Sequence, residues 1–229
     1  SSGIGASTVR KLRAAGVRPG DGVAIMCRNH RGFIEATLAC SKLGAAGLYM
    51  NTSFAGPQLA EVVEREEPVA LIYDREFAEL LSEAGRDLWR FVAWTDGEDA
   101  GDPTLEELIR SNEDSGLDPP EESSHFVILT SGTTGSPKGA QRAQPDTLGP
   151  LAALFSKIPL RAREKTMIAA PLFHSWGFAH FVLGLSLNST YVLRQRFDPE
   201  ETLRTTASSG ATALIVVPVM MQRILELPD

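Results

Sequence analysis

The sequence predicts an α/β fold with a largely parallel sheet, and three observations favour this class. Segments with helical spacing of apolar residues alternate along the chain with short apolar runs typical of strands. Glycine or proline separates most of these segments, as expected at helix ends and in turns. The chain has 229 residues, of which 43% are hydrophobic, so it can bury the core of one large domain or two small ones. Regular alternation of strands and helices is typical of a parallel sheet.

Within residues 1–95 the pattern predicts three helices and three strands. The first helix is expected at residues 6–15 and stops at Gly16, and the second, at residues 32–44, stops at Gly44. Pro57 favours the start of the third helix, because proline is well tolerated at the first helical position. The strands are expected in the apolar runs at residues 22–27, 45–50 and 69–73.

The formal net charge of −7 is concentrated in one segment. Residues 96–124 hold eleven acidic residues and a single base, Arg110, which leaves the rest of the chain slightly basic. We therefore expect no nucleic-acid partner, since neutralising phosphates requires a basic face. The acidic segment is interpreted as a linker or surface excursion with one short helix. It separates a first α/β portion, residues 1–95, from a second portion, residues 125–229.

The segment from Met167 to Leu193 is long enough and apolar enough to raise the question of a membrane span. Its polar residues, among them His174, His180 and Asn188, would be costly facing lipid. The preferred interpretation is a buried helix between two buried strands, with no transmembrane segment, while peripheral membrane contact stays open. A membrane-embedded binding protein is the alternative of a different class.

The cysteines and the N-terminal stretch are consistent with a protein of a reducing compartment. Cys27 and Cys40 lie inside apolar runs, where a thiol usually behaves as a small buried hydrophobe. The polar N-terminal stretch has no apolar core followed by a cleavage site, so a cytoplasmic location is expected. Its first residues, SSGIG, are similar to the end of a dinucleotide-binding fingerprint, but no strand precedes them, and we reject that interpretation.

The segment from Phe126 to Arg142, FVILTSGTTGSPKGAQR, contains the main candidate for a binding site. A β-rich apolar run leads into a loop, and open α/β sheets bind ligands at the carboxyl ends of their strands. Glycines let the backbone approach a ligand closely, while the hydroxyl groups and Lys138 supply donors and a positive charge. Such a loop is suited to polyphosphate. Its spacing is not that of a Walker A loop, and a flexible turn is the alternative.

The stretch ILTSGTTGSPKG resembles the signature loop of the adenylate-forming enzymes, which include acyl-CoA synthetases, luciferase and the adenylation domains of peptide synthetases. The resemblance covers nearly all of the chain, through GVRPGDGVAI, the segment from Lys42 to Ile72, the motif PLFHSWGF and the segment from Phe197 to Leu225. It implies part of the large N-terminal domain of these enzymes, with parallel-rich sheets packed between helices. The SGTTG form is similar to acyl-CoA and aryl-CoA ligases.

The resemblance implies a two-step reaction. A carboxylic acid, with a fatty acid as the first choice, attacks the α-phosphorus of ATP, and coenzyme A then captures the acyl adenylate. Mg²⁺ would help to stabilise the phosphoryl oxygens. Lys138 and His174 would be the catalytic residues, and no metal ligand is assigned. The nucleotide-binding residues would be Thr130, Ser131, Gly132, Thr133, Thr134, Gly135 and Lys138.

A second motif, PLFHSWGF, would supply the acyl site. A lone histidine in an apolar segment is more often a satisfied core residue than a functional one. The resemblance instead implies that His174 lies near the substrate carboxylate and the nucleotide. Trp176 and Phe178 would line the acyl pocket together with Pro218 and Met220, although all four could equally be core residues.

Three points limit the resemblance. After Lys138 the chain reads GAQRAQP, with Arg142 and Ala143 where relatives commonly carry a Ser/Thr-His pair. An adenylating domain that loads an acyl carrier protein remains an alternative to a coenzyme A ligase. Family members are more than twice this length, and no Tyr-Gly pair of the downstream metal-binding segment occurs here. We therefore expect this chain alone to be inactive, with a small C-terminal domain absent.

Overall fold

The computed structural model describes residues 6–110, 120, 124–130, 138–141, 158 and 160–228. Its internal contacts divide the chain into two compact units. The first unit comprises residues 1–27 and 31–143, and the second comprises residues 28–30 and 144–229. A three-residue segment of the N-terminal half thus belongs to the second unit. The two units are described separately below.

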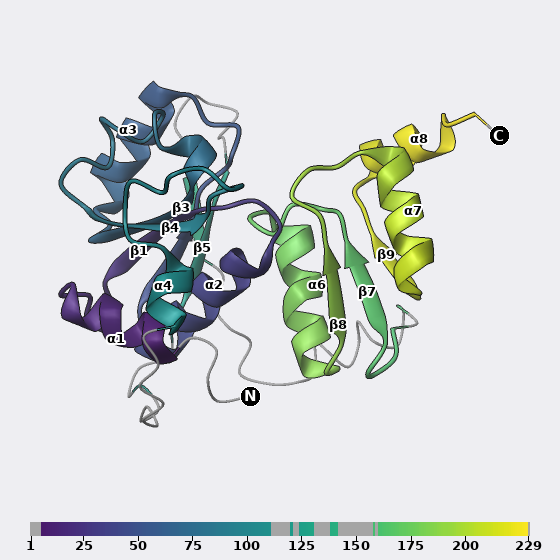
Figure 1. Cartoon of the computed structure of the whole chain (residues 1–229), viewed down its shortest axis with the longest axis horizontal. Coiled ribbons are helices and arrows are strands. Elements are labelled where there is room, and N and C mark those ends of the chain that lie inside the picture. Colours follow the sequence, from purple (N-terminus) through teal and green to yellow (C-terminus); the bar gives the residue numbers. More distant parts are fainter. Residues whose placement is uncertain are drawn as a thin grey trace. The chain divides into compact units, whose positions relative to one another are not determined.

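The first unit is built on a six-stranded sheet in the order β4-β3-β1-β2-β5-β6. All its neighbouring strands run parallel except β5 and β6, which form an antiparallel pair. The expected helices and strands of residues 1–95 are present, with small differences at their ends (Figure 1). The elements are α1 (Ala6–Ala14), β1 (Gly22–Met26), α2 (Arg31–Leu43), β2 (Ala46–Tyr49), α3 (Gly56–Glu66), β3 (Ala70–Asp74), the 3₁₀ turn η1 (Arg75–Phe77), β4 (Trp89–Trp94), α4 (Leu105–Arg110), β5 (Phe126–Thr130) and β6 (Lys138–Gln141).

Helices cover both faces of this sheet, which explains why its central strands are almost continuously apolar. The faces alternate along β1. Ala24 and Met26 join a core cluster that includes Leu59 and Val62 of α3. Alternate residues of the strand, such as Ile25, are equally buried but lie outside that cluster. Helices α1, α2 and α4 pack together beside the sheet (Figure 1). The predicted α/β class with a parallel-rich sheet between helices is therefore confirmed.

The acidic segment is partly integrated into the first unit. Asp102 accepts hydrogen bonds from the Tyr73 hydroxyl at 2.6 Å and from Arg90 Nε at 2.9 Å. Burial raises the pKa of Asp102, but these two hydrogen bonds and the Arg90 and Arg75 charges outweigh burial, so the net pKa is lowered. Leu105 and Leu108 of α4 are buried. The contacts place a boundary after residue 143, because β5 pairs with β2 and β6 with β5.

The second unit is built on a three-stranded parallel sheet in the order β8-β7-β9. Helices connect successive strands, as parallel pairing requires. Figure 1 shows α6 beside β7 and β8, and α7 beside β9. The elements are β7 (Lys165–Ile168), α6 (Ser175–Ser186), β8 (Thr190–Leu193), α7 (Pro199–Ser209), β9 (Ala213–Ile215) and α8 (Pro218–Leu225).

Local sequence signals define the ends of α7. The Asp198 carboxylate accepts a hydrogen bond from the Glu201 N–H at 2.8 Å, and Pro199 occupies the first helical turn. Gly210 ends the helix in the left-handed region, with φ of 67°. The residue types that favour helix ends, an aspartate followed by proline and a glycine, thus lie at the two ends of α7.

The segment from Met167 to Leu193 forms a strand, a helix and a strand, as predicted, but it is less buried than expected. Residues 166–168 of β7 are buried, whereas no residue of β8 is. On α6, Trp176, Val182 and Leu185 are exposed. The reason is that α6 is apolar on all sides, and only one side packs on the sheet. None of the described helices combines the length and apolar character needed to cross a membrane.

Candidate functional site

The predicted phosphate loop lies between two paired strands. Strand β5 ends at Thr130, β6 begins at Lys138, and these two residues are direct partners in the antiparallel pair. Because β1, β2, β3 and β5 run parallel, the loop leaves the carboxyl edge of the sheet, where α/β proteins bind ligands. The other predicted nucleotide-binding residues, Ser131, Gly132, Thr133, Thr134 and Gly135, lie outside the described residues.

The second group of predicted residues lies at the carboxyl edge of the second sheet. Strand β7 ends at Ile168, and residues 169–173 lead from it to His174, immediately before α6. The Ala169 and Ala170 N–H groups both donate to the Ile215 carbonyl of β9 at 3.0 Å. The His174 N–H donates to the Pro171 carbonyl at 3.1 Å, which closes a tight turn into the helix. The chain segment carrying His174 is thus held by backbone hydrogen bonds.

His174 occupies the N-cap position of α6, with extended backbone geometry and no side-chain capping hydrogen bond. Its ring is half-buried and packs against Phe173, with the ring centroids 4.8 Å apart. Partial burial lowers the pKa of His174 below its usual value of 6.5. The imidazole is therefore neutral at pH 7, so one ring nitrogen can donate a hydrogen bond and the other can accept one.

The other residues predicted for the acyl site lie on two elements, Trp176 and Phe178 on α6 and Pro218 on α8. Phe178 follows His174 by four residues and lies on the same side of the helix, half-buried against Phe181. Trp176 is 47% exposed, and its indole N–H donates to the Val216 carbonyl at 3.0 Å, after β9. Pro218 is exposed at the first turn of α8, a position that proline favours for purely structural reasons.

Two residues of this region had no part in the sequence prediction. Gly177 is buried where the first turn of α6 contacts the Pro171 turn, and a Cβ atom there would lie 2.3 Å from the Pro171 carbonyl oxygen. Asn29 is 4% exposed and hydrogen-bonds to backbone groups of residues 168–172. The available signals were a glycine inside an otherwise apolar helix and an asparagine just after a predicted strand.

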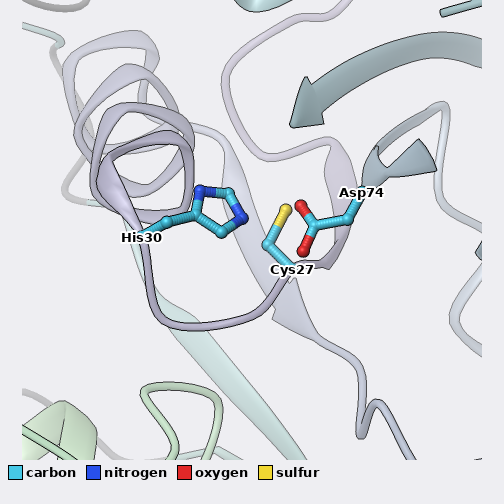
Figure 2. A group of neighbouring side chains, drawn as sticks. All are labelled: Cys27, His30 and Asp74. Atoms are coloured by element: carbon cyan, nitrogen blue, oxygen red, sulfur yellow. The ribbon is translucent and has the colours of Figure 1, made fainter. Parts of the chain in front are cut away.

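A buried cluster in the N-terminal half contains three side chains of types that bind metals. Ligand atoms of Cys27, His30 and Asp74 all lie within 4.8 Å of one another, and Figure 2 shows the Cys27 sulfur between the other two side chains. Burial, followed by the charge and the hydrogen bond of Asp74, raises the pKa of the Cys27 thiol. The thiol donates to the Ile72 carbonyl, with sulfur and oxygen 3.8 Å apart. We therefore interpret the cluster as a structural one with a protonated thiol.

Both cysteines are expected to resist thiol reagents in the folded protein. Cys27 and Cys40 are each 0% exposed, and burial raises the pKa of Cys40 to about 12. Because the thiolate is the reactive form, labelling by a disulfide reagent at pH 8 should require unfolding. The reagent should titrate two thiols per chain in guanidinium chloride and none under native conditions. Rapid labelling of Cys27 in the native protein would show that this cluster is open to solvent.

Two surface hollows of the described first unit do not coincide with the predicted sites. One of about 410 Å³ is lined by residues of the β4 end and α4, and another of about 520 Å³ lies between α1 and β4. The residues lining the first are Arg31, Val92, Ala93, Trp94, Thr95, Asp96, Gly97, Thr104 and Glu106. Neither hollow contains a residue predicted from the sequence to bind ligand. The candidate sites are therefore defined by the residue types at the two sheet edges and not by the size of a surface hollow.

The fold and these two edges define an α/β protein with a candidate polyphosphate loop on its first unit and a candidate acyl site on its second. The family model of the AMP-binding enzymes matches residues 10–229. The chain therefore belongs to the AMP-binding enzyme family, as the resemblance of its loop implied.

Curated relatives agree with this assignment. The chain is 33% identical over 221 residues to the feruloyl-CoA synthase of an Amycolatopsis species, a match that covers 95% of this chain and 42% of the relative. It is 29% identical over 217 residues to the 2-succinylbenzoate–CoA ligase of Bacillus licheniformis, covering 95% of this chain and 43% of the relative. The chain thus spans less than half the length of these relatives.

Solved structures share the fold. The anthranilate CoA ligase AuaEII, in complex with anthranoyl-AMP, superposes with a TM-score of 0.86 at 22% identity, covering 100% of this chain and 45% of that one. The inhibitor-bound N-terminal domain of FACL13 from Mycobacterium tuberculosis gives a TM-score of 0.83 at 21% identity, covering 99% of this chain and 57% of that one. At these identities the likeness concerns the fold.

Proposed function

We propose that this chain is part of an AMP-forming acid–thiol ligase, which activates a carboxylic acid with ATP and transfers the acyl group to coenzyme A. The observation that carries the proposal is the position of the Ser/Thr/Gly/Lys loop between Thr130 and Lys138, paired residues at the carboxyl edge of a parallel sheet. Fixing both ends of the loop reduces its freedom before ATP binds, so less entropy is lost on binding.

In this proposal the loop holds the β- and γ-phosphates of ATP, with Lys138 as the charged donor. Neutral His174 donates a hydrogen bond to the substrate carboxylate or to a phosphoryl oxygen, which orients the attacking oxygen toward the α-phosphorus. Phe178, on the same side of α6, lines the acyl pocket. ATP and coenzyme A are substrates, and Mg²⁺ would neutralise phosphate charge, with no ligand to it assigned in this chain.

The class of carboxylic acid is the more specific part of the proposal. The resemblance to acyl-CoA ligases favours a fatty acid, while the names of the two relatives refer to feruloyl and succinylbenzoate groups, so aryl acids belong in the same test. ATP–pyrophosphate exchange by the intact protein should be measured over a panel of fatty, aryl and aryl-alkanoic acids. Exchange that depends on one class of acid would support the proposal, and no exchange with any acid would refute it.

The acceptor is tested separately. If coenzyme A is the acceptor, mass spectrometry should detect acyl-CoA when ATP, Mg²⁺, the preferred acid and coenzyme A are supplied. If the protein instead loads an acyl carrier protein, the acyl adenylate should accumulate even when coenzyme A is present. It should be consumed only when a carrier protein bearing a phosphopantetheine thiol is added. The second outcome would replace the ligase by a carrier-loading enzyme.

Removing the charge of Lys138 should weaken ATP binding. We expect Lys138→Ala to raise the Kd for ATP about tenfold to a hundredfold, the usual range for losing a hydrogen bond to a charged group. Gly135→Val should weaken binding further, because side-chain bulk would stand where the phosphates approach. Calorimetric titration of the intact protein with ATP and Mg²⁺ measures both effects.

Lys165→Ala is the matched control for this experiment. Lys165 begins β7, at the opposite end of this strand from the segment that leads to His174, and its ammonium group donates to the Ser209 carbonyl at 2.7 Å. The substitution therefore removes a lysine charge that is not part of the predicted phosphate loop. Its Kd for ATP should be unchanged. Unchanged ATP affinity in Lys138→Ala and Gly135→Val would contradict the assignment of the loop to phosphate.

A further inference from the structure

Asn29 makes three hydrogen bonds to the chain that leads from β7 to His174. Its Nδ2 donates to the Ile168 carbonyl at 3.2 Å and to the Ala170 carbonyl at 2.8 Å. Its Oδ1 accepts from the Leu172 N–H at 2.8 Å. Asn29 and residues 168–172 belong to the same unit. Both amide hydrogens and the amide oxygen of this buried side chain are therefore used.

These contacts satisfy backbone groups that would otherwise be costly to bury. Strand β7 ends at Ile168, so the ladder with β8 stops there. Ala170 and Leu172 are nevertheless 0% exposed, and water does not reach them. A buried peptide group without a hydrogen-bond partner destabilises the folded state, because it loses its hydrogen bonds to water and gains none in the protein. Asn29 supplies a partner to the Ala170 carbonyl and to the Leu172 N–H, and it also hydrogen-bonds to the Ile168 carbonyl at the end of the strand. It thus continues the backbone hydrogen bonding past the point where the pairing with β8 stops.

We propose that Asn29 is a positioning residue for the acyl-activation step, because its amide fixes the backbone of residues 168–172 and so places His174. The inference rests on the proposed function, since it takes His174 as the group that contacts the substrate. Asn29 itself touches backbone only. The side chain acts through the Pro171 turn, whose carbonyl accepts from the His174 N–H at 3.1 Å.

The geometry requires an amide at position 29. Asn29→Asp keeps the shape but loses both donors, and it places carboxylate oxygens against the carbonyls of Ile168 and Ala170, 3.2 and 2.8 Å away in the present geometry. Asn29→Ala removes all three hydrogen bonds. We expect Asn29→Asp to loosen residues 168–174 and to slow the reaction at least as much as Asn29→Ala does, although aspartate is much closer in size to asparagine than alanine is.

Hydrogen exchange tests the anchoring without reference to activity. In Asn29→Ala the Leu172 amide loses its acceptor, so exchange of a peptide covering residues 168–174 should accelerate about tenfold or more. Asn29→Asp should accelerate it at least as much, and Asn51→Asp is the matched control for that variant. The Asn51 side chain accepts from the Ser53 N–H at 2.9 Å, a bond that an aspartate also makes, and exchange of residues 168–174 should not change. Unchanged exchange in Asn29→Ala would overturn the inference whatever the protein's activity.

A double-mutant cycle tests the link to His174. We expect Asn29→Ala to slow ATP–pyrophosphate exchange about tenfold to a hundredfold at saturating ATP, because small displacements of a reacting group are costly. The KM for ATP should stay the same. The double variant Asn29→Ala/His174→Ala should be no slower than His174→Ala. Asn29 acts by placing the His174 side chain, and that side chain is absent in both variants. Multiplying effects in the double variant, or a raised KM for ATP with unchanged kcat, would overturn the inference.

The two arms separate failure of this inference from failure of the proposed function. If the wild type shows no exchange with any acid, the proposed function fails, while hydrogen exchange still decides whether Asn29 fixes residues 168–172. If the wild type is active and Asn29→Ala loosens this segment without slowing the reaction, the anchoring is real but the positioning role is refuted. Assays should run well below the melting temperature of every variant, so that unfolding does not imitate loss of activity.

Discussion

Gly177→Ala is expected to destabilise the second unit by about 2 kcal/mol, within the range of overpacked core substitutions. The added Cβ would lie 2.3 Å from the Pro171 oxygen and 2.8 Å from the Ala170 oxygen, both backbone atoms. Neither can rotate away as a flexible side chain would. The gain of helix propensity from glycine to alanine, about 1 kcal/mol, is too small to offset the clash. Relief requires α6 or the Pro171 turn to move, and His174 moves with either.

The same substitution should slow adenylate formation about a hundredfold, because a shift of about 1 Å in a reacting group has an effect of this size. Urea unfolding and ATP–pyrophosphate exchange measure the two effects. Gly56→Ala, at the start of α3, is the matched control, since a Cβ there would meet only a Leu80 methyl group at 3.9 Å. If Gly177→Ala has the stability and the rate of adenylate formation of the wild type, the Pro171 turn can move at little cost in free energy and does not position His174.

His174→Ala should slow adenylate formation about a hundredfold to a thousandfold, the usual effect of removing one donor to developing charge. Its effect on stability at pH 7 should be small, because the ring is only half-buried and makes no capping hydrogen bond. Pre-steady-state measurement of acyl-adenylate formation, with thermal unfolding in parallel, separates the two. A large loss of stability with an unchanged rate would identify His174 as a core residue.

The pKa of His174 adds a pH dependence with a defined sign. Since burial lowers the pKa in the folded state, the unfolded chain binds more protons between that lowered value and 6.5. The stability contributed by His174 should rise with pH through this window and stay constant above it. The rise should be absent in His174→Ala and retained in His125→Ala, which removes an exposed histidine of the first unit. An identical pH dependence in wild type and His174→Ala would contradict a lowered pKa of the half-buried His174 ring.

Much of the first unit could be predicted because its signals are local. The glycine after α1, Pro57 at the start of α3 and the apolar runs of β1 and β3 each act through neighbouring residues. The phosphate loop was visible for the same reason, since its glycines, hydroxyl groups and lysine are contiguous in the chain. Burial was predicted less well. Val182 and Leu185 are as apolar as core residues but face outward on α6, because the composition of a helix does not say how many of its sides are covered.

By itself, then, the sequence determined the α/β class, most of the helices and strands, and the loop that identifies the family, but it did not predict β4 or β6. Only the tertiary structure assigned Asn29 to the segment before His174, and Gly177 to a close approach of two backbones. The hydrogen bonds of Asn29 join residues 139 to 143 positions apart, and no local pattern of residue types encodes such a pairing. This pairing exists because β7 ends at Ile168 while the residues that follow are still buried. Their peptide groups need hydrogen-bond partners, and the fold supplies them with the side-chain amide of Asn29.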